Sequence, residues 1–328
     1  MKQLFLGLLA TCAWAQSMTD LELAVLTTPK VVVRLGGEAD SAEGRRYQGK
    51  VTWNANRDLT LFLSGDRSNL ASTNQATSPD GNATTTTITS LGGSYYWGLA
   101  ELGLQVDRST MSNLLSSRRY YLQPALDRGT WRLGLELSTR RTEFDRLQFT
   151  GRVITTPSGP VAVTGYADLS LSDQGIGGNF EFGGEVWRCF GSYTHYTYDA
   201  FEGSTDVTRI RNAAGQVSSD VFKALYGGLV DRFKRIANSN LSTKAALLDS
   251  TATLGLEASL RRSKWLLEVD QNVDHLTGEV SDTYRGVASW KATSTFTLEV
   301  QVGATRSETF GTDRFLGLAL VFRIGNTF

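Results

Sequence analysis

The sequence predicts an all-β fold, a transmembrane antiparallel up-and-down β-barrel of about 14 strands with one short helix in a long extracellular loop. Three observations predict it. Apolar and polar residues alternate along most of the chain, short connections alternate with longer ones, and the tryptophans fall at one end of the strands. Alternation with a period of two is typical of strands that have two different faces.

The last hairpin, residues 295–306 and 314–324, shows the alternation most clearly. One face of each strand is apolar throughout, and the opposite face carries polar residues such as Glu299 and Arg323. The apolar positions are Phe296, Leu298, Val300, Val302, Ala304, Leu316, Leu318, Leu320, Phe322 and Ile324. The same pattern predicts strands at residues 30–40, 45–55, 58–67, 86–97, 99–108, 116–126, 130–142, 167–182, 185–198, 251–261, 264–274 and 283–292.

The connections between these strands differ in length in a regular way. Short turns at 56–57, 98, 127–129, 183–184, 262–263 and 293–294 alternate with longer segments such as 68–85, 143–166 and 199–250. Membrane barrels have an even number of strands, short turns at the periplasmic end and longer loops outside. We therefore place all the short turns at the periplasmic end.

Six tryptophans each fall near a short turn, on the apolar face of their strand. They are Trp53, Trp97, Trp131, Trp187, Trp265 and Trp290. An indole ring is apolar with one polar N–H, so it suits a membrane–water interface. We predict a membrane girdle there, with tyrosines such as Tyr120, Tyr193 and Tyr196 at the other end. The alternative, a soluble β-sandwich, would scatter its core tryptophans along the strands.

The polar face carries more charge than a dry core tolerates. Its charges come as mixed pairs along a strand, for example Arg132 with Glu136, between residues such as Gly134. The other face of the same strand is Leu133, Leu135 and Leu137. A polar interior and an apolar exterior indicate a barrel with a watery lumen in a membrane.

A terminal alternating strand that ends in Phe328 resembles the closing strand of Gram-negative outer-membrane β-barrels, and the whole pattern resembles porin-like channels of that size. The resemblance implies a location in the outer membrane and contact with its lipid and lipopolysaccharide. It also implies a monomer, and recognition of the C-terminal strand by the outer-membrane assembly machinery.

The N-terminus has the features of a signal peptide, residues 1–15. Lys2 precedes an apolar run, and Ala13-Trp14-Ala15 fits a cleavage site. The alternative is a lipoprotein signal that ends at Cys12. We predict a periplasmic tail at 16–29 and a barrel at 30–328. Cleavage after Ala15 leaves Cys189 alone, so no internal disulfide is expected.

The charge balance argues against nucleic-acid binding, because Lys plus Arg and Asp plus Glu are both 33. We predict a porin-like channel for passive diffusion of small hydrophilic solutes, with weak charge selectivity. The pore-lining candidates are Glu101, Arg119, Arg132, Glu136, Glu181, Arg188, Glu257, Glu268, Arg285 and Glu299. The opposing interpretation is that most of these residues pair across neighbouring strands and line the wall inertly.

Two other functions stay open. One is a sealed surface barrel for adhesion, partner binding or membrane integrity. The other is a hydrolase at the rim that uses His195 or His275 as an acid or base. No Cys or His pair has the spacing of metal ligands, and we expect no cofactor and no catalytic residues.

The longest loop, 199–250, contains a stretch with helical periodicity at 221–236. Ser219 and Asp220 suit the start of a helix, and Lys234 and Arg235 suit its end. We predict a lid over the extracellular opening, with its apolar face formed by Phe222, Leu225, Leu229 and Phe233.

Overall fold

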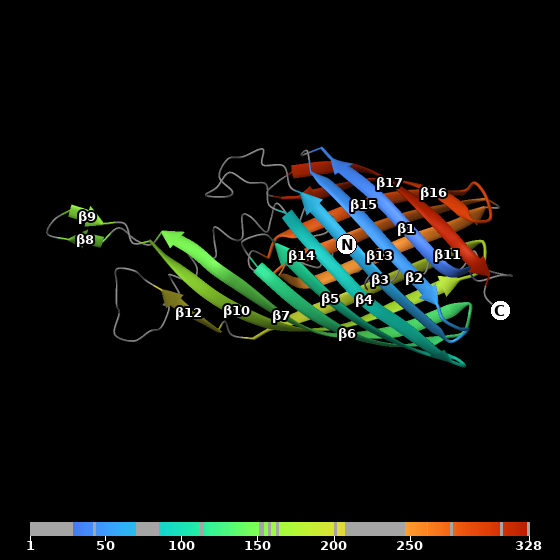
Figure 1. Cartoon of the computed structure of the whole chain (residues 1–328), viewed down its shortest axis with the longest axis horizontal. Helices are drawn as coiled ribbons and strands as arrows, with labels where there is room; N and C mark the ends of the chain where they lie inside the picture. Colours follow the sequence, from blue (N-terminus) through green and yellow to red (C-terminus); the bar gives the residue numbers. More distant parts are fainter. Residues whose placement is uncertain are drawn as a thin grey trace, which may run out of the picture.

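The computed structural model confirms the predicted fold, a closed antiparallel barrel of 14 strands (Figure 1). It describes residues 29–41, 44–69, 85–111, 115–150, 154–156, 159–161, 164–199, 202–206, 247–260, 262–275, 278–308 and 311–326. Among these residues no helix is long and apolar enough to cross a membrane.

All the predicted strands are present, and most of their ends lie within three residues of the prediction. The barrel strands are β1 (Pro29–Asp40), β2 (Arg45–Asn54), β3 (Leu59–Asn69), β4 (Thr85–Trp97), β5 (Ala100–Met111), β6 (Leu115–Asp127), β7 (Trp131–Thr150), β10 (Thr164–Gly183), β11 (Trp187–Tyr198), β13 (Leu248–Leu260), β14 (Ser263–Asp274), β15 (Val280–Lys291), β16 (Phe296–Ser307) and β17 (Gly311–Asn326). The additional strands are β8 (Ile154–Thr156), β9 (Gly159–Val161) and β12 (Glu202–Asp206).

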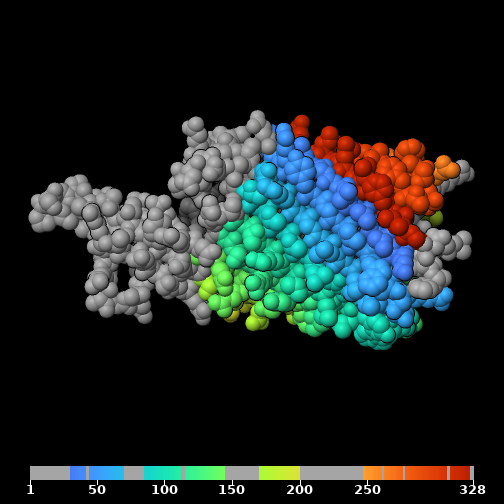
Figure 2. Space-filling model, in the orientation of Figure 1, coloured from blue at the N-terminus to red at the C-terminus, as the bar shows by residue number. Residues whose placement is uncertain are grey.

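The sheet closes where its two ends meet. β1 pairs with β17 from Pro29↔Asn326 to Asp40↔Phe315. Figure 2 shows β17, in red, directly against β1, in blue. The remaining barrel strands pair in chain order, so the described barrel strands leave no unpaired edge. An unpaired edge would be a site of aggregation.

Tight turns join the strands at the end where the tryptophans lie. Gly129 has a φ of 79°, a conformation that a side chain disfavours. The Asp127 carboxylate accepts a hydrogen bond from the Gly129 amide at 2.7 Å. The Asn56 side-chain oxygen accepts one from the amides of Asp58 and Leu59, each at 2.8 Å. Such side-chain bonds fix short turns.

The two faces of the sheet have the polarity of a membrane barrel. Leu135 on β7 and Leu318 on β17 are each 57% exposed on the outer face. On the inner face, Glu101 and Asp173 are 2% and 0% exposed. An apolar exterior around a polar interior suits a protein whose outer solvent is lipid.

β7 and β10 correct the prediction, because both continue into the segment 143–166 that was predicted as a loop. Their pairing runs from Phe182↔Trp131 to Thr164↔Thr150, and β12 pairs with the same end of β10 inside the predicted loop 199–250. In Figure 1 this extension projects beyond the other strands together with β8 and β9. The alternation fails there because Glu143, Asp145 and Arg146 leave no unbroken apolar face.

Several predictions concern residues outside the described ranges. These are the signal peptide, most of the tail, the terminal Phe328 and the lid residues Phe222, Leu225, Leu229 and Phe233. They stay predictions from the sequence.

Candidate functional site

The inner wall of the barrel is the candidate site, and it has two parts. Buried charged side chains gather on the strands β5, β6, β7, β10, β11, β13 and β14. These strands and β15, whose Arg285 pairs with Glu268 of β14, are called the ionic arc. The remaining strands, β16, β17 and β1 to β4, form the mixed arc, where Arg46 is the buried charged residue among those described. In both arcs every second side chain points inward, because side chains along a strand alternate between its two faces.

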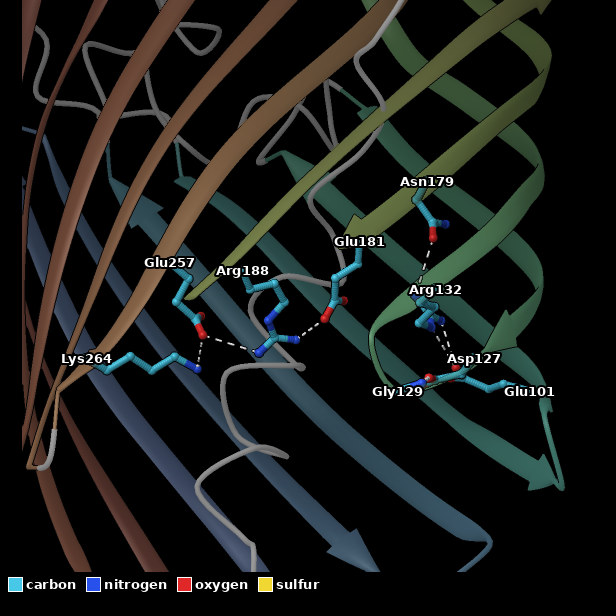
Figure 3. Close-up of polar contacts among 9 residues, drawn as sticks. All are labelled: Glu101, Asp127, Gly129, Arg132, Asn179, Glu181, Arg188, Glu257 and Lys264. Carbon is cyan, nitrogen blue, oxygen red and sulfur yellow. Dashed lines mark hydrogen bonds and ion pairs between the residues drawn. The ribbon is translucent and has the colours of Figure 1, made fainter. Parts of the chain in front are cut away.

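A chain of ion pairs crosses four neighbouring strands of the ionic arc (Figure 3). Lys264 Nζ lies 2.8 Å from Glu257 Oε1, and Arg188 Nη2 lies 3.2 Å from the same oxygen. Arg188 also pairs with Glu181 through its other terminal nitrogen. The chain therefore links β14, β13, β11 and β10 along the wall.

Arg132 on β7 is held by residues of two other strands. Its Nε and Nη2 donate to Glu101 Oε2 on β5 at 3.1 and 2.8 Å, and its Nη1 donates to Asn179 Oδ1 on β10 at 3.3 Å. Figure 3 shows the guanidinium between these two partners. Glu136 lies four residues further along the same strand, roughly 13 Å away along the backbone.

Asp173 on β10 is the most enclosed charge of the ionic arc, at 0% exposure. Its two carboxylate oxygens contact two arginines, Arg119 Nη2 at 3.0 Å and Arg140 Nε at 2.5 Å. The Arg119 guanidinium also lies over the Tyr196 ring, 4.6 Å from its centre. Arg140 Nη2 lies 3.3 Å from the hydroxyl of Tyr198. Such complete pairing is what a buried charge requires.

The other pore-lining candidates also point inward and have partners. Glu136 accepts hydrogen bonds from Gln123 at 3.0 Å and Thr194 at 3.3 Å. Arg285 lies 2.8 Å from Glu268. In the mixed arc, Glu299 accepts a hydrogen bond from Arg34 at 2.9 Å. The structure thus brings all ten candidates to one inner surface, and their role in conduction stays a prediction.

Beside its ion pairs, the mixed arc also encloses small and apolar groups on its inner face. Ala319 and Val321 on β17 are buried there, beside Gly36 on β1. The Phe315 ring of β17 covers Gly303 of β16 so closely that a Cβ at Gly303 would collide with it. An aromatic ring packed on a glycine of the next strand stabilises a sheet where the glycine has no side chain.

Sequence reasoning did not name several buried charged residues of this wall, among them Asp173, Arg140, Lys264 and Asp107. Asp173 could have been found from the alternation, because it lies eight residues before Glu181 and so faces the same side of the strand. Gly175, Gly177 and Gly178 obscured the start of that strand in the sequence. Arg140 and Lys264 also lie on the inward parity of their predicted strands.

The six tryptophans lie within two residues of the strand ends that carry the short turns. Five of them are 45 to 55% exposed, and Trp131 is half-buried. Tyr120 is exposed toward the opposite end of β6, and Tyr193 is exposed near the middle of β11. Tyr196, predicted for that second girdle, is 6% exposed and points inward, because its parity differs from that of Tyr193.

The two histidines have different surroundings. His275 Nδ1 lies 2.5 Å from Asp249 Oδ1, and the ring stacks on Tyr198 with 3.8 Å between ring centres. His195 is exposed on β11. An acid–base pair alone does not define a hydrolase.

Comparison with known proteins adds a likeness of fold. No protein-family model and no curated protein matches the sequence. A solved structure of the CymD monoaromatic hydrocarbon channel matches with a TM-score of 0.53 and 8% identity, over 96% of this chain and 93% of that chain. The KdgM porin in complex with disordered oligogalacturonate gives a TM-score of 0.39 and 8% identity, over 89% of this chain and 98% of that chain.

A third structure, the Acinetobacter baumannii outer membrane protein Omp33, gives a TM-score of 0.41 and 7% identity, over 90% of this chain and 98% of that chain. At these identities the likeness concerns the fold alone. The apolar exterior and polar interior described above, with the fold shared with the CymD channel, give this chain the architecture of an outer-membrane β-barrel. Its architecture is porin-like.

Proposed function

We propose that this barrel is a channel for passive diffusion of small hydrophilic solutes across the outer membrane. One observation carries the proposal: the ion pairs of the inner wall run sideways. Arg188 pairs with the strand on either side of its own, and Arg132 and Arg119 each reach over one intervening strand. Side chains that pair in this way lie along the wall and leave the axis of a wide barrel to water.

The proposed channel has weak charge selectivity. Rings of one sign of charge make a pore selective. Here each carboxylate of the chain from Lys264 to Glu181 contacts a cationic group, so the two signs largely cancel where a solute would pass.

Recordings from refolded protein in planar bilayers test the proposal. We expect discrete conductance steps and a reversal potential close to zero in a KCl gradient. Heat-modified migration on gels, in which unboiled and boiled protein run differently, verifies that the sample is a folded barrel. Folded protein that gives no steps, and that admits no small sugar into liposomes, would contradict a channel.

A sealed barrel is the second candidate, and the low exposure of the inner wall favours it. Thr194 on β11 and Val321 on β17, in different arcs, are both 0% exposed. A wide water-filled pore would wet such residues. In that case the protein would act at the surface, in adhesion, partner binding or membrane integrity. The same recordings separate the two candidates, because a sealed barrel gives no steps.

A further inference from the structure

Three arginines lie side by side on the outer wall. Arg108 on β5 is the direct partner of Arg118 on β6, and Arg118 is the direct partner of Arg141 on β7. All three are exposed. Like charges directly opposite on neighbouring strands destabilise a sheet. We call these residues the arginine row.

The row lies directly above the apolar belt of these strands. The outer-face layer below it is Val106, Tyr120 and Thr139, and the layer below that is Leu104, Leu122 and Leu137. Tyrosine at this level marks the membrane interface, because its ring is apolar and its hydroxyl is wet. The row is therefore at the level of lipid headgroups, at the end of the barrel opposite the short turns.

Among the side chains that the structure describes around the row, Glu143 is the carboxylate paired with it. Glu143 lies 3.3 Å from Arg141, but these two side chains are 55% and 63% exposed, so their pairing is weak. Elsewhere on the outer wall an arginine can lie opposite an acidic residue. Arg306 on β16 is the direct partner of Asp282 on β15. The clustering of three arginines is thus a local feature and not the rule for this rim.

On the β4 side of Arg108, small residues occupy the same height as the row. Thr89 on β4 is the direct partner of Arg108, and Gly65 on β3 is the direct partner of Thr89. A Cβ added at Gly65 would meet nothing within 4 Å. A bulky headgroup that contacts the arginines can therefore spread over these strands without collision.

We propose that the arginine row binds a phosphate group of lipopolysaccharide in the outer leaflet, with acyl chains lying against Leu104, Leu122 and Leu137. Guanidinium groups form paired hydrogen bonds with phosphate oxygens, which a single ammonium group cannot match. A bound phosphate also removes the repulsion between the three directly opposed side chains. Lipopolysaccharide is the phosphate-bearing lipid of the leaflet at that end of a Gram-negative outer-membrane barrel.

Native mass spectrometry of the folded barrel in nonionic detergent, titrated with lipid A, tests the proposal. The row variant carries Arg108→Gln, Arg118→Gln and Arg141→Gln. The control variant carries Arg45→Gln, Arg306→Gln and Arg314→Gln, three exposed arginines outside the row. We expect the row variant to bind lipid A at least about tenfold more weakly than wild type, because it loses the charge-assisted contacts. The control should stay within about twofold of wild type.

Three comparisons complete the test. Lipid A without its phosphates should bind wild type as weakly as intact lipid A binds the row variant, and phosphatidylglycerol should bind more weakly than lipid A. Without lipid, the row variant should unfold at the same or a higher temperature than wild type. Lipid A should raise the unfolding temperature of wild type and of the control variant, but not that of the row variant. The proposal is overturned by unchanged binding in the row variant, equal loss in the control, or a row variant less stable without lipid. Phosphatidylglycerol that binds as tightly as lipid A would equally refute lipopolysaccharide as the ligand.

Discussion

The ionic arc and the mixed arc belong to one sheet, yet they fill the inner face in different ways. The ionic arc encloses charges such as Asp173 and Glu101, each in contact with a guanidinium. The mixed arc encloses mainly neutral groups such as Val321 and Ala319, and Arg46 is its buried charge among the described residues. Enclosing a charge costs several kcal/mol unless a partner offsets it. The comparison teaches that buried charge occurs where neighbouring strands supply opposite charges at matching heights.

The largest expected effect comes from breaking one such set of partners. Asp173→Asn leaves Arg119 and Arg140 enclosed without their carboxylate, and should cost about 3–5 kcal/mol of unfolding free energy. Urea unfolding in lipid vesicles, followed by tryptophan fluorescence, measures it. The matched change in the mixed arc is Glu299→Gln, whose pair with Arg34 is 12% and 15% exposed and should cost less. Equal losses would show that the arcs do not differ.

The outer faces of the two arcs should respond alike. Leu135→Arg in the ionic arc and Leu318→Arg in the mixed arc start from the same exposure, 57%. Each should cost roughly 2–4 kcal/mol near the bilayer midplane, because lipid does not solvate the charge. The same unfolding measurement applies. If one change were tolerated, that arc would not face lipid at that height.

Aromatic rings pack on glycines in both arcs, and a methyl group added to such a glycine should lower the unfolding free energy by a similar amount in each. Gly303 is covered by Phe315 in the mixed arc, and Gly255 by Phe190 in the ionic arc. Alanine at either position should cost about 1–3 kcal/mol, because the methyl group collides with the ring and, at Gly303, also with the backbone oxygen of Tyr284. Gly286→Ala is the control, since its Cβ would meet its nearest neighbours at 3.7 Å, an ordinary contact. A loss of stability at Gly286 similar to the other two would exclude the collision as the cause.

The smallest effect expected is on ion selectivity. Arg188→Gln removes a positive charge that partly neutralises two carboxylates, Glu181 and Glu257. Arg34→Gln removes a positive charge that pairs with one carboxylate, Glu299. Each change should shift the reversal potential slightly toward cations, and Arg188→Gln should shift it more. Bilayer recordings in a KCl gradient measure the shift. A shift toward anions in either variant would argue that these residues do not line the conducting path.

The strands and their two faces could be predicted from the sequence because alternation is a local property. Leu135 and Leu137 lie outside as expected, and Glu136 lies inside. The partners could not be predicted, because pairing depends on strand register, which one sequence does not fix. Arg132 therefore reaches Glu101 on β5, although the chain places Glu136 nearer in sequence. Tyr196 shows a different error, since simple counting from Tyr193 already predicts opposite faces.

The seam between β1 and β17 has a consequence for how the chain folds. Its partners, such as Val31 and Ile324, lie at opposite ends of the chain. Bringing them together closes nearly the longest loop that the chain can form, and no contact at the seam offsets that entropy until both strands are in place. We therefore expect the barrel to close last, and a chain without β17 would keep two unpaired strand edges, those of β1 and β16. In the periplasm such edges are open to pairing with other chains.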